Sequence, residues 1–501
     1  MKIVFRVDSS INIGSGHIMR CLVLADELNK LECSIYFACL PQEGDLISYV
    51  KQRGYDVVLL SSPLNPLIPI NDSDYKAWLL RSSKEDALDF IELVENADIV
   101  ITDHYSIGRE WQSYVRKYLN CFIVAIDDLV REHDADLIID QTLGRLANEY
   151  SGKARVLAGS QYAMLAPNFS GLRQEAISRT LSSNISPKVL VSMGGIDKPN
   201  ATLHVLQSLV EISRARLTVL LSPRSPNYAS VKTWCEQYPN VFHKDFEENM
   251  AKLMMKHDIA VGAPGTTSWE RACLGLPSIL IPLAENQRTI CEQLLLNDAI
   301  VCVSLEDIAE GLDEAYNTIL DNWLSFVKAN LKLCDGLGVK RIAFEIRQLM
   351  NKEFNLNLQL VPASKEDIRM VYEWQCHPKT RQFSLTQNIP TWEEHQRWMI
   401  RKLQSSTDYF YLVEDKKTGC KLGVLRLDMM EPEHYLVSIY IAPDCHGQGV
   451  ATASLQLADY IHANITLHAT VLEANTASQH LFKKANYVQL DPESFIRYPI
   501  N

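Results

Sequence analysis

The chain opens with the stretch Lys2-Ile3-Val4-Phe5-Arg6-Val7-Asp8, continues with Ser9-Ser10-Ile11-Asn12-Ile13-Gly14-Ser15-Gly16-His17, and then places apolar residues at Ile18, Leu22, Ala25 and Leu28. The first stretch is typical of a buried strand and the last has the spacing of one helix face, while the glycines allow a tight turn between them. This order predicts a doubly wound α/β fold. His17 then falls in the first helical turn, where the helix dipole lowers the pKa of an imidazole and favours its neutral form. We expect either a general base at this position or a side chain that only hydrogen-bonds the loop.

The same alternation of β-rich runs and amphipathic helices continues to about residue 350. The β-rich runs are 2–8, 34–40, 56–60, 99–104 and 121–128 in the first part, and 188–193, 216–223, 259–263, 278–283 and 301–305 in the second. Two Rossmann-like halves, about 1–150 and 151–353, are therefore predicted, with a cleft between them.

Composition narrows the classes of function. The 501 residues are enough for about three folding units, and 47% of them are hydrophobic, as in globular proteins. The net charge of −12 opposes binding to nucleic acid. The 12 cysteines form no CxxC pair, so the sequence predicts no zinc site, no other metal and no disulfide framework. No apolar run is long enough to span a membrane, and charge follows the first residues too early for a secretory signal, so we expect a cytoplasmic protein without a membrane partner.

Two turns in the second half each join a strand to a helix, at 192–200 and 261–270. Gly194 and Gly195 leave backbone N–H groups open to an anion such as a phosphate. Thr267 and Ser268 either donate to phosphate oxygens or only cap the next helix. Glu270 has the position and chemistry to accept both hydroxyls of a ribose, and Ala284-Glu285-Asn286-Gln287 follows a strand of the same sheet. Together these residues predict a nucleotide site, although each alone is also explained by a structural role.

Six ordered motifs resemble the UDP-sugar hydrolase family of pseudaminic acid biosynthesis. They are Arg6-Val7-Asp8, Gly14-Ser15-Gly16-His17-Ile18-Met19-Arg20-Cys21-Leu22, Thr102-Asp103-His104-Tyr105, Ser192-Met193-Gly194-Gly195, Ser268-Trp269-Glu270-Arg271 and Leu283-Ala284-Glu285-Asn286-Gln287. The resemblance covers residues 1 to about 350. It implies a GT-B-like arrangement and hydrolysis of UDP-2,4-diacetamido-2,4,6-trideoxy-β-L-altropyranose to UDP and the free sugar.

The resemblance also implies roles for individual residues. His17 would be the general base, with Asp8, Asp103 and Tyr105 as candidates to orient it, the water or the sugar. The UDP-sugar would contact Gly16, Gly194, Gly195, Thr267, Ser268, Glu270, Asn286 and Gln287. A glycosyltransferase of the same layout, acting on a sugar or lipid acceptor, is the alternative for this part.

A new pattern begins with the strand Gln359-Leu360-Val361-Pro362, so we place a domain boundary near residue 354 and a separate α+β domain at 357–501. Its centre reads Leu436-Val437-Ser438-Ile439-Tyr440-Ile441-Ala442-Pro443-Asp444-Cys445-His446-Gly447-Gln448-Gly449-Val450-Ala451 and then continues as a helix. A strand, a glycine turn and a helix in this order form an anion nest for a pyrophosphate.

This second pattern resembles the GNAT acetyltransferase superfamily. The resemblance implies acetyl-CoA as cosubstrate, with its pyrophosphate at Gly447, Gln448, Gly449, Val450 and Ala451, its pantetheine beside Ile439 and Ile441, and a further contact at Asn475. His446 replaces the usual Gln or Arg, and Phe482 replaces the usual general-acid Tyr, so a silent acyl-CoA-binding module is the alternative.

The residues around 367–395 resemble acetyltransferases of nucleotide-linked amino sugars. Fusion to the hydrolase then implies a bifunctional enzyme that acetylates the 4-amino group of UDP-4-amino-4,6-dideoxy-N-acetyl-β-L-altrosamine before hydrolysis, within pseudaminic acid biosynthesis and flagellin glycosylation. Loss of the ammonium proton needs an acceptor, for which Glu433, His434 and Ser438 are the nearest candidates.

Overall fold

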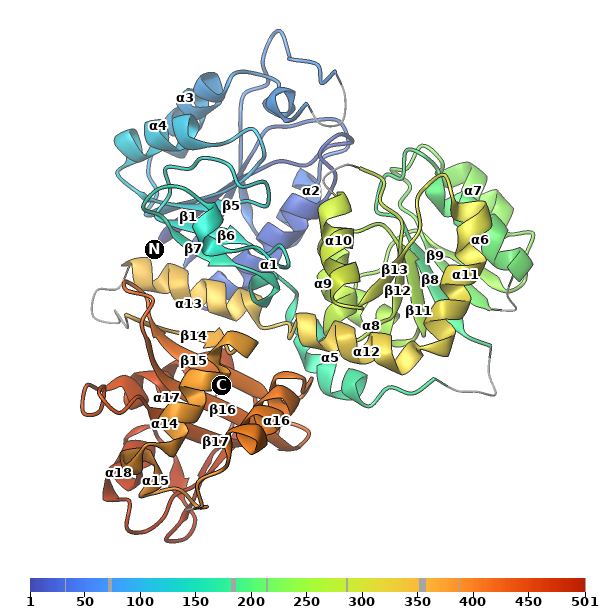
Figure 1. Ribbon diagram of the computed structural model, residues 1–501. Helices are drawn as coiled ribbons and strands as arrows, with labels where there is room; N and C mark the ends of the chain where they lie inside the picture. Colours follow the sequence, from blue (N-terminus) through green and yellow to red (C-terminus); the bar gives the residue numbers. More distant parts are fainter. Residues whose placement is uncertain are drawn as a thin grey trace. The chain divides into compact units, whose positions relative to one another are not determined.

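The computed structural model describes residues 1–31, 33–70, 74–181, 186–212, 215–284, 287–350, 357–386 and 388–500 (Figure 1). The chain forms two compact units, Met1–Ile346 and Arg347–Asn501. The expected boundary near residue 354 lies outside the described residues.

The first sheet is parallel throughout, in the order β3-β2-β1-β4-β5-β6-β7. Its strands alternate their side chains between two buried faces, as expected of a parallel sheet covered by helices. Val4 and Val100 pack against α3 and α4, while the neighbouring residues of the same strands face the other layer. The strands are β1 (Lys2–Val7), β2 (Ser34–Cys39), β3 (Asp56–Leu59), β4 (Ile99–Asp103), β5 (Phe122–Ile126), β6 (Leu137–Asp140) and β7 (Arg155–Ala158), and the helices are α1 (Gly16–Asn29), α2 (Ile47–Gln52), η1 (Tyr75–Leu79), α3 (Ser83–Val94), α4 (Arg109–Leu119), η2 (Ala147–Glu149) and η3 (Ser160–Tyr162).

The second sheet is also parallel, in the order β10-β9-β8-β11-β12-β13. Val189 and Val191 of β8 pack with α6 and α11, whereas Leu190 packs on the opposite face with α5, α8 and α9. The strands are β8 (Lys188–Ser192), β9 (Arg216–Leu220), β10 (Val241–Lys244), β11 (Ile259–Gly262), β12 (Ser278–Leu280) and β13 (Ile300–Cys302), and the helices are α5 (Pro167–Ile177), α6 (Ala201–Ile212), α7 (Tyr228–Cys235), α8 (Met250–Met255), α9 (Thr266–Cys273), α10 (Arg288–Leu296), α11 (Ile308–Asp321) and α12 (Trp323–Leu333).

Helix α13 (Gly338–Met350) follows the last helix of the second Rossmann-like half and contacts the first half. Glu345 forms an ion pair with Arg155 of β7, and Arg341 Nη1 donates to the Gln161 carbonyl over 2.9 Å. Because β7 belongs to the first sheet, that sheet extends beyond the expected border near residue 150.

The C-terminal unit is built on one sheet in the order β14-β15-β16-β17-β18-β20-β19. Its neighbours are antiparallel except β17 and β18, which run parallel but pair only from His434↔Thr466 to Leu436↔His468. The strands are β14 (Leu358–Pro362), β15 (Tyr409–Asp415), β16 (Lys421–Glu431), β17 (His434–Ile441), β18 (Thr466–Thr470), β19 (Val488–Gln489) and β20 (Ser494–Arg497), and the helices are η6 (Lys365–Asp367), α14 (Ile368–Cys376), α15 (Pro378–Arg381), α16 (Trp392–Leu403), α17 (Val450–Ile461) and α18 (Thr476–Lys484).

Candidate active sites

A cavity of about 270 Å³ lies between the two sheets of the first unit. Both halves contribute to its wall, which matches the cleft expected from the sequence. The first half supplies Ile13, Gly16, His17, Arg20, Tyr105, Asp128, Leu129, Gln141, Thr142 and Arg145, and the second supplies Pro264, Gly265, Thr266, Trp269, Gln287, Thr289 and Ile290.

His17 reaches this cavity from the first turn of α1. Its Nδ1 lies 2.6 Å from Asp103 Oδ1, at the end of β4. Arg20 Nη2 lies 3.2 Å from the same nitrogen. A carboxylate only accepts hydrogen bonds, so the shorter contact with Asp103 favours the tautomer of the neutral ring that carries its proton on Nδ1. Nε2 then carries the lone pair that can accept a proton. The side chain is 8% exposed, so its environment is largely protein.

Asp103 is itself held by Arg20, three residues after His17 on the same helix. Arg20 Nε and Nη2 donate to the two carboxylate oxygens over 2.7 and 2.6 Å. Burial alone would raise the pKa of Asp103, but the Arg20 charge and hydrogen bonds, with those of His17, hold it well below its ordinary value. Asp103 therefore stays ionised and fixes the imidazole.

Aromatic rings pack the sides of the imidazole. The Tyr105 ring meets His17 edge-on, with centroids 4.8 Å apart, and stacks on Trp78 at 5.5 Å. Burial and the neighbouring Asp128 carboxylate raise the pKa of Tyr105 well above its ordinary value, so the phenol stays protonated. Trp78 belongs to η1, a short helix that the sequence did not indicate.

Asp8 does not orient His17, and its expected catalytic role is corrected here. Its Oδ1 accepts from Arg6 Nη1 over 2.6 Å and from the Leu40 amide over 2.8 Å. Arg6 also binds Asp86 of α3, so this ion cluster lies on the α3 face of the sheet. Side chains alternate along a strand, and Val7, not Asp8, stands level with Asp103.

In the second half, Thr267 and Ser268 have structural partners. Ser268 Oγ accepts from the Gly265 amide over 3.3 Å, and Thr267 Oγ1 accepts from Arg271 Nη2 over 3.3 Å. Neither hydroxyl lines the cavity, so helix capping is the role that the structure displays. The wall is formed instead by Gly265 and Thr266, at the N-terminus of α9.

The other expected UDP contacts are placed as follows. Gly16 and Gln287 line the cavity, and Gln287 Oε1 accepts from the Leu283 amide over 2.8 Å. A β-carbon at Gly195 would lie 3.9 Å from Ser15 Oγ, so the two glycine loops approach each other across the halves. Gly194 is exposed beside Gly195, and Asn286 lies outside the described residues.

Glu270 is a buried carboxyl whose Oε2 has no hydrogen-bond partner among the described residues. Burial raises its pKa to about 7, against the opposing effect of Arg271. An unpartnered buried oxygen of this kind suits a ligand hydroxyl. Glu270 is not among the residues that line the cavity, and the ribose contact expected from the sequence stays a prediction.

Several lining residues escaped sequence reasoning. Asp128 follows β5, while Gln141 and Thr142 follow β6, and Arg145 reaches the Asp140 carboxylate over 2.6 Å. Strand β6 was not expected, so the residues at its end carried no signal. Arg20 could have been predicted from the sequence, because a basic residue one turn after His17 lies on the same helix face.

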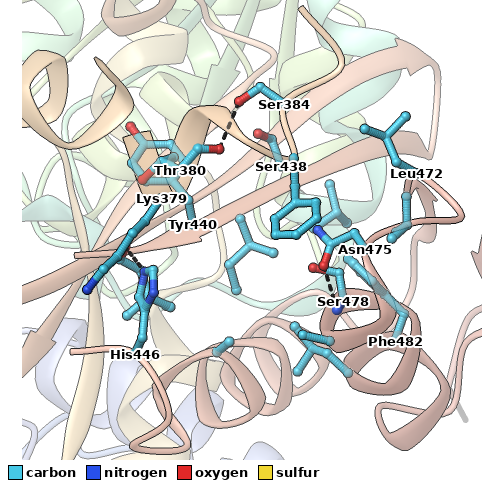
Figure 2. A pocket seen from close by; sticks show the side chains of 18 of the residues that line it. Lys379, Thr380, Ser384, Ser438, Tyr440, His446, Leu472, Asn475, Ser478 and Phe482 are labelled. Atoms are coloured by element: carbon cyan, nitrogen blue, oxygen red, sulfur yellow. Dashed lines mark hydrogen bonds between the residues drawn. The ribbon is translucent and has the colours of Figure 1, made fainter. Parts of the chain in front are cut away.

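The C-terminal unit contains a second cavity, of about 870 Å³ (Figure 2). Seven of the eight expected acetyl-CoA contacts line this cavity, and Gln448 does not. The seven are Ile439, Ile441, Gly447, Gly449, Val450, Ala451 and Asn475. Gln448 bonds the Asp444 carbonyl over 3.3 Å instead. Asn475 also caps α18, since its Oδ1 accepts from the Ser478 amide over 3.1 Å.

The turn before α17 has the backbone of an anion nest. Gly447 and Gly449 have φ angles of +77° and +78°, a region that side chains disfavour, and an added β-carbon at either would meet open space. His446 Nε2 donates to the Ile441 carbonyl over 3.1 Å and so ties this turn to β17. Beyond Leu436, the edge of β17 next to β18 has no strand partner among the described residues. An extended pantetheine chain has the hydrogen-bonding groups to pair there.

Some of the side chains considered for catalysis in this unit line the cavity and others do not. Phe482 lines the cavity but is 3% exposed and packs on Tyr487, with ring centroids 5.0 Å apart. Ser438 lines the cavity, whereas His434 Nδ1 lies 2.9 Å from His468 Nε2 and Glu433 occupies the turn before β17. Only Ser438 of the three named proton acceptors is therefore at the site.

The described residues include no group of three or more His, Cys, Asp or Glu side chains arranged to hold a metal ion. Every helix in the described part of the chain is too short or too polar to cross a lipid bilayer.

The two units resemble different known proteins. Residues 357–488 match the acetyltransferase (GNAT) domain family. The UDP-2,4-diacetamido-2,4,6-trideoxy-beta-L-altropyranose hydrolase of Campylobacter jejuni is 30% identical over 260 residues, which are 51% of this chain and 81% of that protein. Acetyltransferase PseH of Campylobacter jejuni is 25% identical over 134 residues, 26% of this chain and 82% of that protein. An uncharacterized Methanocaldococcus jannaschii protein, MJ1062, is 23% identical over 97% of this chain and 96% of its own length.

Among solved structures, the calicheamicin glycosyltransferase CalG4 matches with a TM-score of 0.52 and 14% identity, over 70% of this chain and 98% of that chain. At this identity the match shows the fold, and it confirms the GT-B arrangement expected from the sequence. The family resemblances are confirmed as well. The chain belongs to the family of UDP-2,4-diacetamido-2,4,6-trideoxy-beta-L-altropyranose hydrolase, here joined to a C-terminal GNAT acetyltransferase domain.

Proposed function

We propose that this chain performs two consecutive reactions of pseudaminic acid biosynthesis. The C-terminal unit transfers acetyl from acetyl-CoA to the 4-amino group of UDP-4-amino-4,6-dideoxy-N-acetyl-β-L-altrosamine, and the N-terminal unit hydrolyses the product to UDP and free sugar. The observation that carries the second step is the His17–Asp103 contact of 2.6 Å in a cavity lined by both halves.

The proposed hydrolysis uses this pair as follows. Nε2 of His17 accepts a proton from water as the water oxygen attacks the anomeric carbon, and the ionised Asp103 stabilises the resulting imidazolium. The carbon–oxygen bond to UDP breaks on the opposite face, so the sugar is released with inversion. The N-terminus of α9 supports the negative charge on the departing diphosphate.

Two supports favour UDP as the leaving group. The Campylobacter relative is named for a UDP-sugar substrate. The unpartnered Glu270 oxygen suits a ribose hydroxyl, because a carboxylate accepts two hydrogen bonds side by side. Asp128 and Tyr105 lie on the His17 side of the cavity, where sugar hydroxyls or amides require polar partners.

The acetyl step is linked to the hydrolase by chemistry. The substrate named for the relative carries two acetamido groups, and an acetamido group forms when acetyl is transferred to an amine. In that transfer, the amine nitrogen loses a proton and attacks the thioester carbonyl, the new C–N bond forms, and the C–S bond breaks. The CoA sulfur leaves as thiolate and takes up a proton. The buried Phe482 cannot donate it, so water or another donor is required.

The test is mass spectrometry of the 4-amino UDP-sugar incubated with intact protein and acetyl-CoA. We expect the acetylated UDP-sugar first, then free diacetamido sugar and UDP, and His17→Ala should stop the sequence at the acetylated UDP-sugar. Sugar release only when an acceptor is added would favour the glycosyltransferase alternative. Absence of amine-dependent CoA thiol would favour the silent acyl-CoA-binding module.

A further inference from the structure

The larger cavity has a second polar wall besides the glycine nest. Thr380 Oγ1, Arg381 Nε and the Tyr440 hydroxyl are all buried, and none has a hydrogen-bond partner among the described residues. All three residues line the cavity. Buried polar atoms are normally paired, so three unpaired atoms around one cavity indicate a ligand that supplies the missing partners.

The three residues come from α15 and β17. Ser384 Oγ donates to the Thr380 carbonyl over 3.1 Å, and Arg381 Nη1 donates to the Thr386 carbonyl over 2.8 Å, which fixes the loop. Burial raises the pKa of Tyr440 well above its ordinary value, and the charges of Arg426 and, to a smaller extent, Arg381 oppose this shift. The phenol therefore remains a hydrogen-bond donor. Figure 2 shows Thr380, Lys379 and Tyr440 together on the side of the cavity away from Asn475 and Phe482.

The charge of the residues that line the cavity indicates which class of ligand binds at this wall. The described lining residues include no Asp or Glu, and Lys379 and Arg381 supply the positive charge of this wall. Of the other basic lining residues, Arg426 is paired with Asp428 and Lys484 lies on α18. A polycationic amine would need carboxylates to bind here. The hydroxyl and guanidinium donors instead match acceptor oxygens that carry negative charge.

The strand register places Tyr440 on one face of the sheet. Tyr440 pairs with Val424 and packs with the α14 and α16 side of the sheet. The adjacent pair, Leu425 and Tyr411, faces the other side, where the Tyr411 hydroxyl meets His462 at the C-terminal end of α17 over 3.0 Å. The body of α17 therefore lies on the face opposite Tyr440, whereas the nest at its N-terminal end lines the same cavity as Tyr440.

We propose that Thr380, Arg381 and Tyr440 form a subsite for the diphosphate of a nucleotide-linked amine acceptor. This inference rests on the proposed acetyl-transfer function and assigns that acceptor to one wall of the cavity. Thr380 and Tyr440 donate their hydroxyl protons, and Arg381 adds a charged donor. The reacting amine then extends toward Ser438, which stands two residues before Tyr440 on the same face of β17.

The test compares two acceptors in steady-state acetyl transfer by the full chain. One is the 4-amino UDP-sugar, and the other is the same amino sugar without the nucleotide. For Tyr440→Phe, Arg381→Gln and Thr380→Val, we expect KM for the UDP-sugar to rise about tenfold or more, because each variant removes a donor to a charged group. KM for acetyl-CoA and kcat/KM for the free amino sugar should change less than about twofold. The exposed residues Tyr498 and Arg401 provide matched controls, Tyr498→Phe and Arg401→Gln.

UDP gives an independent readout. It should inhibit acetyl transfer competitively against the UDP-sugar but not against acetyl-CoA, and its inhibition constant should rise in the three variants by the same factor as KM. This readout follows only the acetyl-transfer site, whatever UDP does at the hydrolase site.

The contrary outcomes are distinct. If the wild type acetylates the UDP-sugar and the variants match it, the subsite is wrong and the proposed function stands. An equal loss of kcat with both acceptors, or a rise in KM for acetyl-CoA, overturns the subsite in favour of a proton-donor or CoA-binding role. If the wild type acetylates only the free sugar, both proposals fail.

Discussion

At the scale of single residues, the molecule's chemistry depends on which carboxylate meets His17. Asp103 does so at 2.6 Å, and Arg20 keeps it charged. The pair resembles other imidazole–carboxylate arrangements in which the acid fixes the tautomer and stabilises the imidazolium. In the proposed hydrolysis, this arrangement serves the role of His17 as the base.

Asp103→Asn should lower the kcat of UDP-sugar hydrolysis by about 10²–10⁴-fold with little change in UDP binding, because the amide no longer fixes the tautomer or balances the imidazolium charge. Initial rates and UDP titration by calorimetry measure the two quantities. Asp136→Asn is the matched control, since that carboxylate bonds Arg116 outside the cavity. Unchanged kcat in Asp103→Asn would remove the carboxylate from the mechanism.

Glu270 predicts a pH dependence of UDP binding. Its pKa of about 7 means that the free protein holds a protonated carboxyl at mildly acidic pH, whereas two ribose hydroxyls donate best to a carboxylate. UDP binding should therefore release protons at pH 6 to 7 and tighten as the pH rises through about 7. Glu270→Gln should abolish the proton release. Calorimetry in buffers of different ionisation enthalpy measures it, and equal release in the variant would contradict the assignment.

The same group affects stability with a definite sign. Its pKa is raised in the folded state above the ordinary value of 4.5, so folding favours the protonated form. The contribution of Glu270 to the free energy of unfolding is fully present below about pH 4.5. It is lost as the pH rises through about 7. By this linkage Glu270→Gln should be more stable than the wild type above pH 7, by up to about 3 kcal/mol.

At the scale of elements, both units contain the same arrangement of a strand, a glycine turn and a helix. β1 and α1 present His17, β11 and α9 present a helix N-terminus, and β17 and α17 enclose the nest at Gly447 and Gly449. Each places backbone N–H groups or a reactive side chain at the carboxyl end of a strand.

Gly449→Ala should raise KM for acetyl-CoA and cost about 1 kcal/mol of stability, because alanine strains the left-handed φ of +78° and displaces a nest amide. Gly419→Ala is the matched control. Its φ is +69° in an exposed turn away from the cavity, so it should lose similar stability with KM unchanged. An equal effect of the two variants on KM would show that the nest does not hold the cosubstrate.

Sequence periodicity predicted the elements that carry these turns, because their strands are apolar runs followed by glycine. It missed β6, β7 and β10, which are four residues each and lie at or near sheet edges. It also could not decide between Asp8 and Asp103. Both end a strand, and only the register, which sets Val7 level with Asp103, shows which carboxylate shares a face with α1.

At the scale of the whole molecule, each of the two compact units contains a candidate site, for which we propose different ligands. A cosubstrate that belongs to one unit should protect backbone amides there. Hydrogen exchange with and without acetyl-CoA should slow peptides covering 438–451 and leave those covering 99–105 and 264–270 unchanged. Protection confined to the first unit would contradict the assignment of acetyl-CoA to the second.

The GT-B arrangement serves transferases as well as hydrolases, so the fold does not decide the nucleophile. In either reaction a base takes a proton from the nucleophile, and hydrolysis is distinguished by water being that nucleophile. In the proposed hydrolysis His17, in the cavity lined by both halves, is that base.

Hydrolysis of the diacetamido UDP-sugar in H₂¹⁸O, without any acceptor, tests this claim most directly. Mass spectrometry should find one ¹⁸O in the free sugar and none in UDP, NMR should show the inverted anomer first, and His17→Ala should lose the reaction. Label in the UDP phosphate, a retained anomer or undiminished turnover in His17→Ala would contradict water activation by His17.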